Sequence, residues 1–135
     1  MSALVLIASS DPRRLLRLRR MVENEGAVAL TASDTREAMH AFVRREPDLT
    51  LLYADSDDDH GIELCRDMKR LRTGRRTSVV VVATSDFRLA AFAAGCDAFV
   101  KRENDPGPLA RTVRGYIGRI RRSRPEGPIT IESVA

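Results

Sequence analysis

The sequence predicts an α/β domain built on a parallel sheet, because short apolar runs alternate with amphipathic segments along the 135 residues. The run at residues 78–83 contains four consecutive valines, as expected of a central strand covered on both faces. The composition, 43% hydrophobic and 31% charged, is that of a globular chain with one core. No apolar run approaches the roughly 20 residues that a membrane-spanning helix needs.

The predicted elements alternate in strict order. Strands are expected at residues 4–8, 27–31, 49–54, 78–83 and 97–101. Helices are expected at residues 12–25, 34–45, 61–71, 87–94 (a short one) and 105–122. Asp34 and Glu37 have the spacing of a capping box at the start of the second helix. The first apolar run has no basic residues before it, so we interpret it as a strand and not a signal peptide.

Right-handed crossovers leave few topologies for such an alternation. We expect a single doubly wound sheet in three layers, with strand order 2-1-3-4-5. The domain is predicted to span residues 1–122, and residues 123–135 to form a flexible C-terminal tail. No further domain is expected, so the protein should act by binding.

Five short stretches at the ends of these elements carry a family resemblance. They are Ala8-Ser9-Ser10-Asp11-Pro12, the segment 46–52 (EPDLTLL), Gly61-Ile62-Glu63-Leu64-Cys65, the segment 94–99 (AGCDAF) and Asp105-Pro106. In this order and spacing, residues 3–122 resemble the receiver domain of bacterial two-component response regulators. The resemblance implies a flavodoxin-like fold with its site at the carboxyl edge of the sheet.

The resemblance also implies a specific chemistry. An acidic pair after the first strand and an aspartate ending the third hold Mg²⁺, and that aspartate accepts a phosphoryl group. A Thr or Ser after the fourth strand and a Lys after the fifth bind the phosphoryl oxygens. Matched position by position, this sequence has other residues at all five places: Ser9, Ser10, Tyr53, Ala83 and Arg102.

Four alternatives concern these positions and the acidic loop beside them. A register one residue different would place Thr84 at the Thr/Ser position, and Lys101 is a second candidate for the Lys position. Asp55 could be a displaced phosphoacceptor, although we expect it in a solvated acidic loop. Asp55, Asp57 and Asp59 have the opening spacing of a calcium loop, but His60 and Arg66 replace its Gly and Glu. We therefore predict no metal and no other cofactor.

Tyr53 is expected to fill the vacated pocket. We predict that its ring packs over Ser9, Ser10 and Ala83, with Ser9, Ser10 or Arg102 as partners for its hydroxyl. The alternative is an exposed tyrosine that contacts a partner or is modified.

Basic residues should gather on one face of the sheet, because the first and last helices share a face in this topology. The arginines of these helices and just beyond are Arg13, Arg14, Arg17, Arg19, Arg20, Arg111, Arg114, Arg119, Arg121, Arg122 and Arg124. With a net charge of +4, they form either a solvated surface or a docking surface for an acidic partner. The interaction-surface candidates are Arg13, Arg17, Arg20, Phe99, Arg114 and Arg121.

Together these observations predict a non-enzymatic pseudo-receiver, a phosphorylation-independent signalling module that binds another signalling or regulatory protein. A homodimer through the fourth helix, fifth strand and fifth helix is a further expectation from the resemblance. The alternative is a nucleic-acid-associated regulator using the basic face, although no helix-turn-helix unit or interleaved aromatics support it.

Cys65 and Cys96 have no metal-binding spacing, so we expect reduced thiols in a cytoplasmic protein without membrane contact.

Overall fold

Five parallel strands form the central sheet of the computed structural model, which describes residues 2–55, 60–71, 77–102 and 106–123. The strands are β1 (Leu4–Ala8), β2 (Val28–Ala32), β3 (Leu49–Tyr53), β4 (Ser78–Ala83) and β5 (Ala98–Lys101). Their order is β2-β1-β3-β4-β5, which confirms the predicted doubly wound topology.

The helices lie close to their predicted ranges. They are α1 (Pro12–Asn24), α2 (Thr35–Arg45), α3 (Gly61–Arg70), α4 (Arg88–Ala93) and α5 (Gly107–Ser123). The short α4 is confirmed. Strand β2 begins one residue later than expected, because the Ala27 N–H still donates to the Val22 carbonyl and belongs to the turn after α1. The predicted tail lies, from residue 124 on, outside the described residues.

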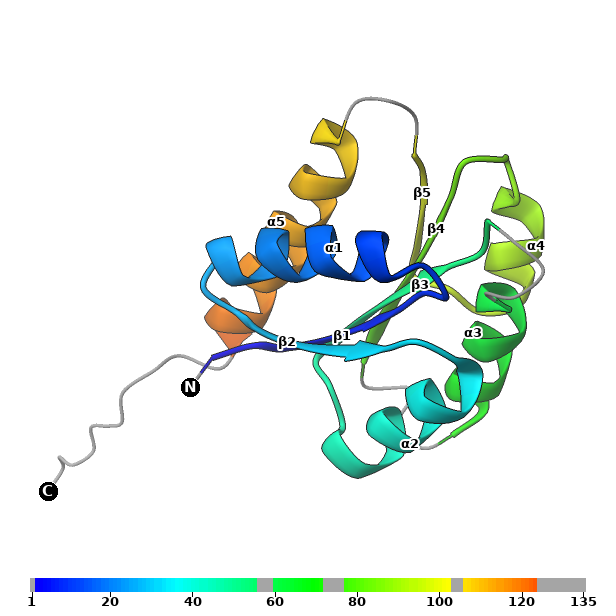
Figure 1. Ribbon diagram of the computed structural model, residues 1–135, viewed down its shortest axis with the longest axis horizontal. Coiled ribbons are helices and arrows are strands. Elements are labelled where there is room, and N and C mark those ends of the chain that lie inside the picture. The colour runs from blue at the N-terminus through cyan, green and yellow to red at the C-terminus, as the bar shows by residue number, and fades with distance from the viewer. Residues whose placement is uncertain (1, 56–59, 72–76, 103–105, 124–135) are drawn as a thin grey trace, which may run out of the picture.

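Two apolar cores lie on opposite faces of the sheet. Helices α1 and α5 cover one face, and α2, α3 and α4 cover the other (Figure 1). The α1/α5 core contains Val5, Leu51 and Val82, whereas their neighbours along the strands, including Leu6, Leu52 and Val81, belong to the other core. This alternation is the two-residue period of strands buried on both faces.

Side-chain caps fix where the first two helices begin. The Asp11 carboxylate accepts a hydrogen bond from the Arg13 N–H at 2.9 Å, just before Pro12. Asp34 accepts from the Glu37 N–H at 2.7 Å, and the Glu37 carboxylate accepts from the Ser33 N–H at 2.8 Å. The predicted capping box is therefore present, with Glu37 reaching one residue further back than expected.

Carboxylates also fix the amino ends of the strands. The Asp48 carboxylate accepts from the Leu4 N–H at 2.8 Å, and Asp97 accepts from the Val79 N–H at 2.7 Å. Lys69 on α3 lies 2.7 Å from the same Asp97 oxygen. No helix among the described residues is long and apolar enough to span a membrane.

Candidate functional site

The carboxyl ends of β1, β3 and β4 meet at one edge of the sheet, where doubly wound folds hold their functional groups. Ser9 follows β1 directly, and its buried Oγ accepts from the Asp11 N–H at 3.1 Å. Ser10 is exposed beside it. The Arg102 N–H donates to the Ala83 carbonyl at 2.7 Å, so the end of β5 joins the same edge. The five positions matched from the sequence thus lie on segments that meet here.

Tyr53 is buried at this edge, with 2% of its surface exposed. Its side chain belongs to the α1/α5 core. Burial raises the pKa of the phenol above its ordinary value of 10.0, and the nearby charges of Arg102 and Arg14 oppose that rise. The hydroxyl therefore stays protonated at neutral pH.

The expected packing of Tyr53 over Ala83 is wrong. Tyr53 pairs with Val82 across the sheet, and both belong to the α1/α5 core. Ala83 is the next residue along β4, so its side chain points to the opposite face and lies in the other core. The ring therefore fills space on one side of the sheet only.

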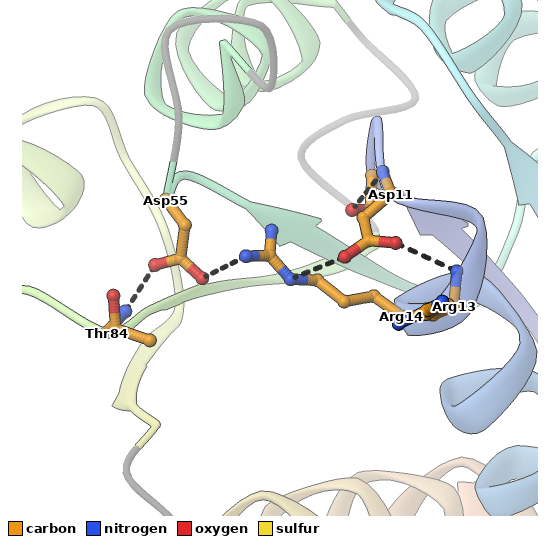
Figure 2. A network of polar contacts seen from close by, with 6 residues as sticks. Asp11, Arg13, Arg14, Asp55 and Thr84 are labelled. Carbon is orange, nitrogen blue, oxygen red and sulfur yellow. Dashed lines mark hydrogen bonds and ion pairs between the residues drawn. The ribbon is translucent and has the colours of Figure 1, made fainter.

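Arg14 is the residue at this site that sequence reasoning did not select. Its guanidinium carbon lies 4.9 Å from the centre of the Tyr53 ring. Arg14 Nε lies 3.7 Å from Asp11 Oδ2, and Nη2 lies 3.4 Å from Asp55 Oδ2 (Figure 2). The sequence pattern groups Arg14 with the surface arginines of the first helix, but its place one turn after Asp11 directs it back to the sheet edge.

The sequence predicts that Asp55 is solvated in an acidic loop, and this prediction is wrong. Only 5% of its side chain is exposed. One carboxylate oxygen accepts a hydrogen bond from the Thr84 N–H, and the other faces Arg14 (Figure 2). Thr84 thus contributes its backbone to the network, which runs from the start of α1 across the end of β3 to the segment after β4.

Gly61 explains why α3 can begin so close to β3. A Cβ atom at this position would lie 2.1 Å from the Tyr53 carbonyl oxygen. His60, the residue before it, has a left-handed backbone with φ of 50°. The first turn of α3 therefore contacts the backbone of the buried tyrosine directly.

The residues present do not fit the metal ion that the family resemblance implies. Serine hydroxyls replace the acidic pair, and they are weaker ligands for Mg²⁺ than carboxylates are. The carboxylates of Asp11 and Asp55 face a guanidinium. Within the described ranges, no three His, Cys, Asp or Glu side chains are arranged to hold a metal. Asp57 and Asp59 of the calcium-loop hypothesis lie outside those ranges.

The arginines among the interaction-surface candidates are exposed, and two of them, Arg114 and Arg121, also contact Glu25. Arg13, Arg17 and Arg20 are exposed on α1. Arg114 of α5 pairs with Glu25 at 3.1 Å, and Arg121 donates to the Glu25 carbonyl at 2.6 Å. These two arginines therefore join α5 to the end of α1.

Phe99, the one apolar residue among the predicted surface candidates, is not exposed. The residue is 9% exposed and belongs to the core under α3 and α4, and the Arg88 guanidinium carbon lies 5.3 Å from the centre of its ring. The exposed apolar side chains near it are Phe87, Leu89 and Phe92, on or next to α4.

Comparison with known proteins identifies the class. The sequence profile of the response regulator receiver domain matches residues 5–114. The fold resembles that of a CheY-like receiver domain from Methanospirillum hungatei, with a TM-score of 0.77 and 20% identity over 91% of this chain and 99% of that one. TrrA from Thermotoga maritima, solved in complex with Mg²⁺-BeF, gives a TM-score of 0.73 and 18% identity over 84% of this chain and 98% of its own. Structural likeness at these identities shows the fold.

The chain belongs to the response regulator receiver domain family. A curated relative from Leptolyngbya boryana, described as an uncharacterized 14.6 kDa protein in the 3′ region of sodA1, is 28% identical over 115 residues. The match covers 83% of this chain and 88% of the relative. The receiver-type signalling role and the doubly wound fold predicted from the sequence are therefore supported together.

Proposed function

We propose that this receiver domain is a pseudo-receiver, a phosphorylation-independent module that signals by binding another protein. The observation that carries the proposal is the burial of Tyr53, the residue that the sequence match assigns to the phosphoacceptor position, with its phenol protonated. A phenol with a pKa above 10 cannot replace an aspartate in forming an acyl phosphate. Such a module regulates without catalysing a reaction, and the cytoplasm is its proposed location.

The rest of the edge supports the same proposal. Ser9 and Ser10 offer hydroxyls where the family has carboxylates, so no strong pair of metal ligands remains after β1. Without a metal ion, nothing there neutralises the charge of a transferring phosphoryl group. Arg102 offers a cation at the Lys position, but a cation alone does not supply a nucleophile.

Exposed side chains offer surfaces for a partner. Leu89 is 90% exposed and Phe92 is 48% exposed on α4. They support a contact through α4, β5 and α5, either with another signalling or regulatory protein or with a second copy of this chain. The exposed Arg13, Arg17 and Arg20 on α1 offer a separate basic surface for an acidic partner.

Phosphorylation tests the proposal directly. Incubation with acetyl phosphate or beryllofluoride and Mg²⁺ should leave the intact mass unchanged and the amide NMR signals around Tyr53 in place. A receiver domain known to be phosphorylated serves as the control for the reagents. A stoichiometric aspartyl phosphate, on Asp55 or any other residue, would overturn the proposal.

Nucleic-acid binding remains the less favoured function. Arg114 and Arg121 contact Glu25, so part of the basic face is engaged inside the domain. Any binding to DNA or RNA should be independent of sequence and should weaken steeply with salt, because it depends on phosphate contacts. A gel shift at physiological salt that shows tight, sequence-selective binding would favour this function instead.

A further inference from the structure

We infer that Arg14 supplies, from within the chain, the positive charge that a receiver domain takes from a divalent cation, and that its guanidinium excludes metal ions from this edge. The inference rests on the proposed function, because it explains what holds the site together when no phosphoryl group or metal does so. Arg14 is in this sense the residue that determines which cation the site accepts.

The charges at the site support this role. The guanidinium lies between two carboxylates from different segments, Asp11 before α1 and Asp55 after β3 (Figure 2). Its several N–H groups can face both carboxylates at once, which a single ammonium group does less well. A divalent cation recruited by the same two carboxylates would have to take the place of this group.

Arg14 is also held in position by its surroundings. Its side chain is 21% exposed and its guanidinium lies 4.9 Å from the centre of the Tyr53 ring, a favourable cation–π distance. The Asp55 side chain is 5% exposed, so removing the guanidinium would leave a largely desolvated carboxylate without its ion pair to Arg14.

The same contacts connect three segments of the sheet edge. Arg14 joins the start of α1 to Asp55, and Asp55 joins the end of β3 to the Thr84 N–H after β4. The arginine is therefore a positioning residue for the segment after β4, which it reaches through Asp55.

The test compares Arg14→Gln with Arg14→Lys and with the matched control Arg13→Gln. Glutamine keeps much of the side-chain stem over Tyr53 but removes the charge, whereas lysine keeps the charge. Arg13 is the adjacent, exposed arginine of the same helix, and the change spares its backbone bond to Asp11. Each folded protein is titrated with Mn²⁺, and paramagnetic broadening of its backbone amide NMR signals is recorded.

In the wild type, Arg14→Lys and Arg13→Gln, the signals of Asp11, Asp55 and Thr84 should persist at millimolar Mn²⁺. In Arg14→Gln these signals should broaden, and excess Mg²⁺ should restore them. The Thr84 amide should also exchange with solvent on the order of tenfold faster in Arg14→Gln, since its acceptor is no longer held.

Broadening of these signals in the wild type, or none in Arg14→Gln, would overturn the inference. If Arg14→Gln does not fold, the wild-type and Arg14→Lys titrations still decide whether the site excludes the ion. A failure of the proposed function is recognised separately, because it appears as a phosphoryl adduct on the wild-type protein.

Discussion

At the scale of single residues, the burial of Tyr53 indicates that this side chain stabilises the core. The ring is 2% exposed and contributes to the α1/α5 core. Tyr53→Ala should therefore leave a cavity and lower the free energy of unfolding by about 3 kcal/mol. Urea unfolding measures the change, with Leu89→Ala, at a side chain that is 90% exposed, as the control. Equal stability of Tyr53→Ala and the wild type would mean that the ring is not part of the core.

At this scale the sequence pointed to Tyr53 and Ser9 at the sheet edge but not to the contacts that Arg14 and Asp55 make there. Tyr53 and Ser9 could be placed because flanking motifs fix their register. Arg14 and Asp55 could not, since one looks like a surface arginine and the other like part of an acidic loop. Their ion pair joins residues 41 positions apart, and only the meeting of β1 and β3 brings them together.

At the scale of elements, two glycines should respond to substitution in opposite ways. Gly61 lies where α3 approaches β3 closely, whereas Gly115 lies on α5 with open space around it. Gly61→Ala should destabilise the fold by about 1–3 kcal/mol, because a Cβ would meet the Tyr53 carbonyl oxygen at 2.1 Å. Gly115→Ala on α5 has no atom within 4 Å of the new Cβ and should stabilise the helix by about 0.5–1 kcal/mol. Thermal unfolding of both variants gives the comparison. The same sign of change for both would contradict the close approach.

Element positions were predictable because the apolar period of each segment is clear. The valines of β4 and the capping box of α2 are local signals, so they predict these elements without knowledge of the fold. The direction of Ala83 was missed because it depends on which residue Tyr53 pairs with across the sheet. The burial of Phe99 was not predicted, because it depends on how α4 packs over β5.

At the scale of the whole molecule, two buried thiols couple the stability of the fold to alkaline pH. Burial raises the pKa of Cys65 from 9.0 to about 12 and that of Cys96 to about 11. The unfolded chain ionises first, so the stabilising effect is complete below pH 9.0 and is lost as the pH rises towards 12. The free energy of unfolding should therefore fall over this range.

Urea unfolding near neutral pH and at about pH 11 measures this dependence. The Cys65→Ala, Cys96→Ala double variant should lose less stability between the two conditions than the wild type. The raised pKa of Tyr53 acts in the same direction, so part of the alkaline loss should remain in that variant. An identical pH dependence in both proteins would show that the thiols ionise as they do in water.

The burial of Tyr53 and Ser9 at the sheet edge has a consequence for how this domain can change over generations. Restoring an aspartate at Tyr53 alone would replace a core ring with a buried carboxylate, beside Asp55 and without an acidic pair at Ser9 and Ser10. Restoring a carboxylate at Ser9 first would place a negative charge in a buried position next to Asp11. Either of these two single changes should thus lower stability without supplying the other groups that phosphoryl transfer needs. Under the proposed function, a return to phosphoryl transfer would therefore need several changes made together.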